Sequence, residues 1–393
     1  MGEKVYLYCF FIMVSVGLYQ NINRLDLLEE DILRVWVSSD EFKVLSKLNE
    51  QFEEKYGVKI EMKIMTSEQV VSNLPLYVGT PDYPDVITLS HTLISQLVQM
   101  NALSPISDIF EELNILPAVK SGFKFKGEYY GVPYNADTDI LFYDKSKFPE
   151  GLSAFNALDD YSDVSLVIDY QDIYHITPFV TGFGGYTVGI DNFGDTNFYD
   201  IGLNKEESIL GLSMMLQLLE PSAFYNNEGD IYKSFLNSKA NLMIAPAKLV
   251  NSLSESYDNL GYQAIPNFKE DVLPYTYMKI DTYQLTKYSQ NKDLAKEYFR
   301  FLLSVDVATA RYEYNRSIAP VDYEVPISQD EYYTVVKKQL HRSLPLPNQS
   351  EFNYLYLPYK EAAKEFVSMP DQIQSILDTA VRQIDDQIES ILK

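Results

Sequence analysis

The order of strand-like and helix-like segments constrains this fold most. Residues 33–37 (Leu-Arg-Val-Trp-Val) have strand character, and residues 38–40 (Ser-Ser-Asp) follow as turn and helix-start residues. The next apolar side chains recur at helical spacing, at Phe42, Leu45, Leu48 and Phe52. Gly57 ends this helix, residues 58–64 alternate apolar with polar side chains, and residues 85–89 form a buried type of strand. This β-α-β opening predicts a parallel sheet in an α/β protein.

The alternation continues to the end of the chain. Further strands are predicted at residues 140–143, 165–168 and 242–244, and further helices at residues 209–219 and 292–303. After Pro370, isoleucines recur at helical spacing, which predicts a final amphipathic helix docked on the core. A chain of 393 residues exceeds one efficient core, yet no Gly/Ser-rich linker divides it. We therefore expect two domains that are joined by more than one crossing segment.

The N-terminus has the layout of an export signal. Lys4 precedes an apolar run over residues 5–14, and the small residues Ser15 and Gly17 follow it. This pattern predicts a signal peptide over residues 1–17, with an uncleaved membrane anchor as the alternative. No later apolar run approaches membrane-spanning length, so the rest of the chain is expected to be soluble.

Charge and composition exclude several classes of function. The formal net charge is −24, so the surface would repel nucleic acid. Cys9 is the single cysteine, and His91, His175 and His341 lie far apart, which excludes a disulfide and a cysteine-ligated metal. Motifs for nucleotide binding, zinc proteases and α/β-hydrolases do not occur. We expect no cofactor and no metal.

Four segments together resemble a known family. They begin with Val-Trp-Val at residue 35, Tyr-Pro-Asp-Val-Ile at residue 83, Gly-Glu-Tyr-Tyr-Gly-Val-Pro-Tyr at residue 127, and Asn-Lys-Asp-Leu-Ala-Lys at residue 291. In this order they resemble the extracellular solute-binding proteins of ABC importers, and most closely the maltose/maltodextrin-binding branch. The resemblance spans roughly residues 33–393, and no single motif in it is diagnostic.

The resemblance implies a two-lobed periplasmic-binding-protein-like (type II) α/β fold with a hinge and an interdomain ligand cleft. The N-terminal lobe would comprise residues 33–137 plus 279–327, and the C-terminal lobe residues 138–278 plus 328–393. Such a protein would work as a monomer outside the cytoplasm, in the periplasm or tethered at the cell surface. It would close on a small solute, which in this branch is a sugar, and hand it to the membrane permease.

The resemblance also implies ligand contacts. Asp40, Asp137, Asp172 and Tyr174 stand at positions that contact sugar in the maltose branch, with Asp137 in place of the usual Glu. Carboxylates accept hydrogen bonds from sugar hydroxyls, and aromatic rings pack on the apolar face of a pyranose. Asp40 is also an ordinary residue for a helix start, so capping alone would explain it.

The departures from the family pattern leave the ligand open. Leu89, Leu249 and Asn353 stand where the branch has stacking tryptophans. Thr92 and Leu93 stand where it has an Asp-Arg pair. Tyr134, Tyr283 and Tyr354 are candidates to supply replacement aromatic faces. Lys248 is a candidate contact for an anionic ligand. The complete expected ligand-binding set is Asp40, Thr92, Tyr134, Asp137, Asp172, Tyr174, Lys248, Tyr283, Asn353 and Tyr354.

Other interpretations stay open at this point. Trp36 is expected in the core rather than as a sugar platform, and His91 is expected to satisfy local backbone groups. Asp137 with Asp172 would be the carboxylate pair of a glycoside hydrolase, although 56 acidic residues make such pairs common by chance. A tethered receptor or adhesin that binds a protein partner is the third class.

Overall fold

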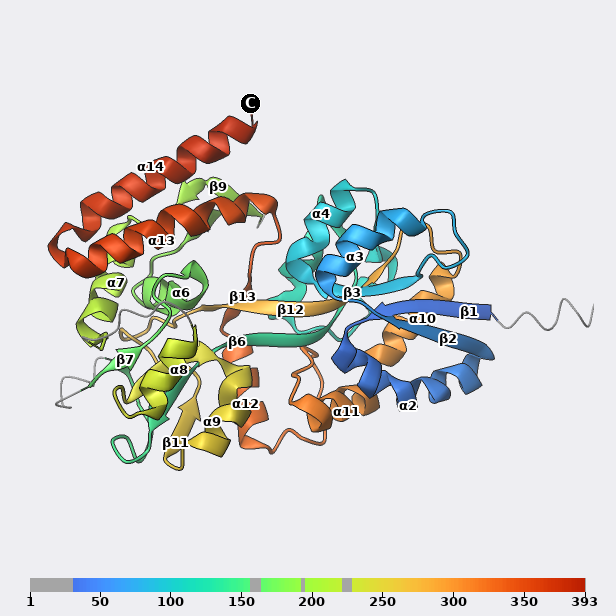
Figure 1. Ribbon diagram of the computed structural model, residues 1–393, viewed down its shortest axis with the longest axis horizontal. Coiled ribbons are helices and arrows are strands. Elements are labelled where there is room, and N and C mark those ends of the chain that lie inside the picture. Colours follow the sequence, from blue (N-terminus) through green and yellow to red (C-terminus); the bar gives the residue numbers. More distant parts are fainter. Residues whose placement is uncertain (1–30, 156–163, 192–194, 221–227, 393) are drawn as a thin grey trace, which may run out of the picture.

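A nine-stranded mixed sheet runs through the molecule and connects its two halves (Figure 1). The computed structural model describes residues 31–155, 164–191, 195–220 and 228–392. In Figure 1 the blue and cyan elements form the half on the right together with the orange helices α10 and α11. Green, yellow and red elements form the other half. The predicted signal peptide lies outside the described residues.

The predicted β-α-β opening is confirmed. Strand β1 (Asp31–Val37) pairs in parallel with β2 (Val58–Ile64), and α2 (Ser39–Tyr56) connects them. The side chain of Ser38 caps the start of α2. Of the helix-start residues 38–40 that the sequence offered, the first is therefore the cap. Gly57 ends the helix with φ 66°, a left-handed conformation that glycine adopts without steric cost.

Three further strands complete this half of the sheet. Strand β3 (Val86–Ser90) pairs in parallel with β1, and β12 (Thr276–Leu285) runs antiparallel to β3 and to β6 (Val132–Asp144). The resulting order is β2-β1-β3-β12-β6. The apolar residues 140–143 predicted only the end of β6, because Asn135 and two aspartates in its first part are unfavourable in strands.

Strand β6 passes from one half of the molecule into the other. Its last residues pair with β10 (Leu242–Pro246) and β11 (Leu260–Gln263), and β10 pairs in parallel with β7 (Leu166–Val167). At the crossing, strand β13 (Ser343–Pro345) lies beside β12. Buried hydroxyls of Thr138, Thr276 and Ser343 hydrogen-bond to one another there and tie the three strands together.

Helices cover the second half of the sheet. Helix α6 (Ile173–Gly182) packs on α7 (Glu206–Leu218), and α13 (Asn353–Ser368) packs on α14 (Ile373–Leu392). The predicted C-terminal helix is thus confirmed as α14, which lies along α13 at the top left of Figure 1.

The remaining elements are short or lie at the periphery. They are α3 (Ser67–Asn73), η1 (Leu74–Tyr77), η2 (His91–Leu93), α4 (Ile94–Gln99), α5 (Ser107–Phe110), η3 (Pro117–Phe123), β4 (Lys124–Phe125), β5 (Glu128–Tyr129), β8 (Val188–Ile190), β9 (Thr196–Ile201), α8 (Glu228–Leu236), η5 (Ala247–Leu249), α9 (Val250–Ser256), α10 (Lys292–Leu302), α11 (Val305–Asn315), α12 (Glu331–Leu340), η6 (Ser350–Phe352) and η7 (Pro370–Gln372).

Two hydrophobic cores flank the sheet. Alternate side chains of β6 enter different cores: Ile140 and Phe142 belong to the core that also holds β1 to β3, and Leu141 and Tyr143 belong to the core under α6, α13 and α14. A single strand therefore contributes side chains to both cores, and no one position in the sequence divides them. The lobe boundaries expected from the resemblance stay predictions.

Candidate functional site

A cavity of about 240 Å³ opens where β1, β2 and β3 end. The carboxyl ends of parallel strands meet at one edge of a sheet, which is where open α/β sheets bind ligands. The loops after these strands and the crossing strands β6 and β12 supply the walls. The lining residues are Ser38, Asp40, Glu41, Met65, Thr66, Ser67, Thr88, Leu89, Tyr134, Asn135, Asp281, Asn315 and Ser317.

Two of the predicted ligand-binding residues, Asp40 and Tyr134, line this cavity. Asp40 lies exposed in the first turn of α2, where Ser38 rather than Asp40 is the capping residue. Its carboxylate is therefore not used to cap the helix. The sequence analysis missed Asp281, which also lines the cavity and accepts a hydrogen bond of 2.9 Å from Asn135 Nδ2. Burial raises the pKa of Asp281, the hydrogen bond from Asn135 lowers it, and the charge of Glu41 raises it again.

A buried ionic network supports the floor of the cavity. Arg311 Nε donates to both carboxylate oxygens of Glu41 at 3.0 Å, and both side chains are at most 2% exposed. Arg311 Nη2 donates to the hydroxyl of Tyr283 at 3.1 Å, and that hydroxyl donates to Glu41. The guanidinium carbon lies 5.4 Å from the ring centroid of Tyr134. The network was missed, although an arginine among Val307, Ala308 and Tyr312 on the buried face of α11 is a visible signal.

Tyr283 differs from the expectation. Its side chain is 0% exposed, and its ring lies 4.8 Å from that of Tyr134, measured between centroids. Tyr283 belongs to β12, which is covered on both faces at this point, so the ring has no surface to offer a ligand. The expectation that Tyr283 supplies a replacement platform is wrong for this structure, and its place is beneath Tyr134.

A second group of predicted residues meets around β6, and its members Asp137, Tyr174 and Lys248 are not among the described residues that line the 240 Å³ cavity. The hydroxyl of Tyr174 donates to the backbone carbonyl of Asp137 at 3.3 Å, and Lys279 Nζ lies 4.6 Å from the centroid of the Tyr174 ring. Burial raises the pKa of Asp137 to about 6, against the opposing effect of the Lys248 charge and its backbone N–H. The nearby Asp139 carboxylate raises it further. Asp137, Tyr174 and Lys248 are therefore brought together, from β6, α6 and η5.

An ion pair lies behind this group. His175 Nδ1 and Asp139 Oδ2 are 2.7 Å apart, and both side chains are buried. Burial disfavours the charged imidazole, but Asp139 outweighs that effect and raises the pKa of His175 to about 9. Asp172 caps α6 by accepting a hydrogen bond of 2.8 Å from the Tyr174 backbone N–H. One predicted sugar contact thus also orients the helix that carries another.

The other predicted contacts lie farther from the cavity. Thr92 is half-buried in η2, 3.0 Å from the Ser90 hydroxyl measured between oxygens. At the start of α13, Asn353 is exposed and Tyr354 is half-buried. None of Thr92, Asn353 and Tyr354 is among the described residues that line the 240 Å³ cavity.

Trp36 is placed as expected, and His91 does satisfy backbone groups, although these are distant in the chain rather than local. Trp36 is 2% exposed and packs edge-on against Tyr77, so it is a core residue. His91 is buried: its Nδ1 accepts a hydrogen bond of 3.1 Å from the Ile280 backbone N–H, and its Nε2 donates to the Leu346 carbonyl at 2.9 Å. Burial lowers the pKa of His91 to about 4, which keeps the imidazole neutral between these backbone groups.

The described ranges contain no cluster of three His, Cys, Asp or Glu side chains arranged to hold a metal ion. Within the same ranges, no helix combines the length and the apolar character that a membrane crossing requires.

Comparisons with known proteins agree with this geometry. Residues 36–309 match the family described as bacterial extracellular solute-binding protein. The chain is 23% identical over 384 residues to the galactooligosaccharide-binding protein of Bacillus subtilis (strain 168), covering 91% of this chain and 90% of that one. It is 21% identical over 386 residues to the maltooligosaccharide ABC transporter solute-binding lipoprotein of Streptococcus pneumoniae serotype 4, covering 91% and 89%.

Solved structures show the same fold. A maltose-binding periplasmic protein from Listeria monocytogenes, in complex with maltose, superposes with a TM-score of 0.83 at 20% identity, covering 92% of this chain and 99% of that one. A cyclo/maltodextrin-binding protein complexed with maltotetraose gives a TM-score of 0.82 at 18% identity, covering 92% and 98%. The predicted two-lobed fold is confirmed.

Proposed function

The chain belongs to the family of bacterial extracellular solute-binding proteins, and on this premise we propose that it captures an oligosaccharide for an ABC importer. The observation that carries the proposal is the cavity at the strand ends, which Asp40, Asp281, Asn135 and Tyr134 line together. Hydrogen-bonding groups beside one aromatic face suit a sugar, which has hydroxyls at its edge and an apolar ring face. The printed names of the relatives, for maltooligosaccharides and galactooligosaccharides, support this ligand class.

In this proposal the two halves close on the ligand and perform no chemistry. Asp40, Asp281 and Tyr134 would hold the sugar from one side of the cleft, and Asp137 with Lys248 would meet it from the other. The buried Glu41–Arg311 pair keeps the Tyr134 ring in place, because Arg311 is hydrogen-bonded to Glu41, to the Leu302 carbonyl and to the Tyr283 hydroxyl. The loaded protein would then deliver the sugar to the permease subunits as a monomer outside the cytoplasm.

The direct test measures thermal unfolding of the mature protein with maltotetraose and with a galactooligosaccharide. A ligand that binds only the folded protein stabilises it by about 2.7 kcal/mol at one hundred times its Kd, so the melting temperature must rise. Absence of any shift with all oligosaccharides tested would contradict the proposal and favour the receptor or adhesin class. Release of shortened sugars during the measurement would instead identify a glycoside hydrolase.

The binding face is tested by a matched pair of variants. Tyr134→Leu keeps a large apolar side chain but removes the aromatic face, and we expect oligosaccharide affinity to fall about three- to tenfold, in line with roughly 0.5–1.5 kcal/mol of stacking. Tyr134→Phe keeps the face and is the control. Calorimetric titration that finds equal affinity for both variants would place the ligand elsewhere.

A further inference from the structure

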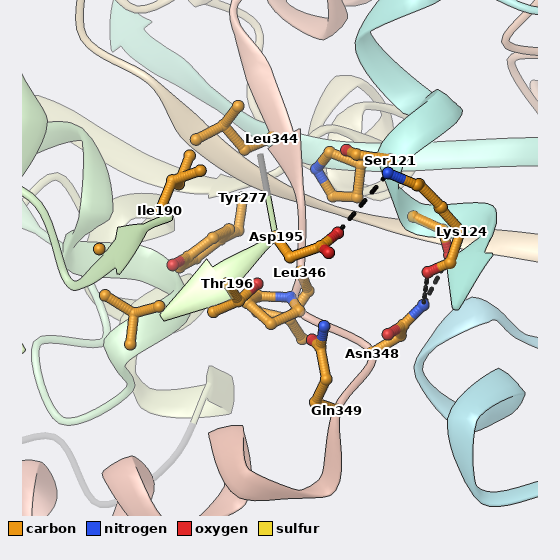
Figure 2. Close-up of a pocket in the computed structure, with 15 residues that line it drawn as sticks. Ser121, Lys124, Ile190, Asp195, Thr196, Tyr277, Leu344, Leu346, Asn348 and Gln349 are labelled. Atoms are coloured by element: carbon orange, nitrogen blue, oxygen red, sulfur yellow. Dashed lines mark hydrogen bonds and ion pairs between the residues drawn. The ribbon is translucent and has the colours of Figure 1, made fainter. Parts of the chain in front are cut away.

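Two cavities outside the proposed sugar site have charged side chains in their walls. The cavity in Figure 2, of about 110 Å³, is lined by both members of an ion pair, with Lys124 Nζ and Asp195 Oδ1 3.8 Å apart, so its charges balance each other. The other cavity, of about 20 Å³, is lined by residues of α6, α8, β10 and η5, and the buried ring of His175 is part of its wall. We call it the His175 pocket.

One nitrogen of the His175 ring is available to this pocket. Nδ1 is paired with Asp139 Oδ2 at 2.7 Å, and within the described part of the chain the ring makes no hydrogen bond through Nε2. His175 is only 4% exposed, so little water reaches it. Because Asp139 raises the pKa of His175 to about 9, Nε2 carries a proton at neutral pH and is a hydrogen-bond donor. A buried donor without a partner is costly, so the His175 pocket calls for an acceptor.

Most of the remaining wall is apolar and suits a small apolar group. Ile231, Met243 and Leu249 line the pocket, and Asp169 is the other charged residue in its wall. The volume of about 20 Å³ admits one small group, since a single water needs roughly 10–15 Å³. A water against these apolar side chains would lose hydrogen bonds that it has in bulk solvent. A guest with a methyl group beside a hydrogen-bond acceptor fits both kinds of surface.

The His175 pocket adjoins residues that the proposed function places around the sugar. Leu249 follows Lys248 in η5, and Lys248 acts on the carboxyl of Asp137 through its charge and its backbone N–H. Tyr174 precedes His175 on α6, and its hydroxyl donates to the Asp137 carbonyl at 3.3 Å. A substituent of a sugar held by this group would therefore lie close to the pocket.

The acetamido group of an N-acetylated sugar has the parts that this wall requires. It combines a carbonyl acceptor, an N–H donor and a methyl group, whereas the hydroxyl of a plain hexose has no apolar part. We propose, on the premise that the protein binds an oligosaccharide, that the His175 pocket takes the acetamido group of an N-acetylhexosamine unit. The carbonyl oxygen accepts from His175 Nε2, and the methyl group packs against Met243 and Leu249. The N–H faces Asp169, because a carboxylate oxygen accepts more than one hydrogen bond.

Calorimetric titration with N-acetyllactosamine and with lactose tests the inference, because these disaccharides differ only by an acetamido group in place of one hydroxyl. We expect N-acetyllactosamine to bind roughly tenfold more tightly or better, as a filled apolar pocket with a satisfied donor allows. Equal affinities, tighter binding of lactose, or no binding of either disaccharide would overturn the inference. Binding of maltotetraose or a galactooligosaccharide in the same assay would then leave the proposed function standing, whereas no binding of any oligosaccharide would overturn both.

A matched pair of variants locates the acetamido group. Leu249→Phe enlarges a half-buried side chain of the pocket wall, and we expect it to abolish the preference for N-acetyllactosamine over lactose. Leu210→Phe makes the same substitution on α7, at a position that is 51% exposed and outside the pocket, and should keep the preference. Thermal melts of both variants verify that they are folded. An undiminished preference in Leu249→Phe would place the acetamido group elsewhere and overturn the proposal.

Discussion

Asp137 is the residue of the crossing strands through which pH would act on the proposed ligand binding. Its carboxyl lies among Lys248, Asp139 and the buried ring of Tyr174, and burial is the main reason that its pKa reaches about 6. A carboxyl with that pKa changes its charge near neutral pH. An ionised carboxylate accepts hydrogen bonds from sugar hydroxyls better than a protonated one, so its titration would bear on ligand binding if Asp137 contacts the sugar as proposed.

We predict that oligosaccharide affinity rises between pH 5 and pH 7.5, by about tenfold if the ligand needs the ionised carboxylate. The Asp137→Asn variant should bind more weakly at pH 7.5 and show a flatter dependence over the same range. Calorimetric titrations of both proteins at the two pH values check this. Identical pH profiles for the two proteins would remove Asp137 from the ligand contacts.

The buried pair of Asp139 and His175 makes a separate prediction on stability. The pKa of His175 is raised from 6.5 to about 9 in the folded protein, so its stabilisation is complete below pH 6.5 and is lost as pH rises through 9. Between pH 7 and pH 10 we expect the wild type to lose on the order of 3 kcal/mol relative to the double variant Asp139→Asn/His175→Gln, which lacks both charges. Urea unfolding at both pH values measures the difference. A constant difference would mean that the imidazole is not charged in the folded protein.

At the scale of elements, close helix packing holds the second half of the sheet together. Helices α6 and α7 approach so closely at Gly211 that a Cβ placed there would lie 2.0 Å from the backbone oxygen of Phe179. Backbone cannot move aside as a flexible side chain can. Since α6 carries Asp172, Tyr174 and His175, this contact also sets where those residues stand relative to the cleft.

We therefore predict that Gly211→Ala lowers the free energy of unfolding by about 2–3 kcal/mol through overpacking. Ser213→Ala, at a half-buried position on the same helix, is the control and should change stability by no more than about 0.5 kcal/mol. Urea midpoints compare the three proteins. If Gly211→Ala and Ser213→Ala behaved alike, the two helices would be farther apart than the structure places them.

At the scale of the whole molecule, the proposed function requires that the two halves move as bodies. Strands β6 and β12 pass between the halves side by side. At this crossing the hydroxyls of Thr138, Thr276 and Ser343 are hydrogen-bonded to one another. Hinge closure around a ligand concentrates backbone rotation in a few such crossing residues.

Small-angle scattering tests this closure. Saturating maltotetraose, with binding established by calorimetry, should reduce the radius of gyration of the wild type. The weakened Tyr134→Leu variant should need a correspondingly higher maltotetraose concentration for the same change. Superimposable profiles with and without the bound sugar would rule out closure as the way in which this protein holds its ligand.

Local patterns were sufficient for much of the architecture. The strand at residues 33–37, the following helix and its glycine end, and the C-terminal helix were predicted correctly, because hydrophobic periodicity and capping depend on residues close in the chain. The ordered family-like segments carried the two-lobed fold, which the solved relatives confirm.

The sequence by itself thus determined many of the strands and helices, and through their order the family and its fold. Only the tertiary structure decided that Tyr283 lies under Tyr134 rather than beside a ligand, and that Glu41 pairs with Arg311 across 270 positions of the chain. It likewise placed the Asn348 side chain between the halves, where its amide nitrogen donates to the Gly122 carbonyl. The physical reason is that side-chain burial and electrostatic pairing depend on distances in space, which neighbouring residues along the chain do not encode.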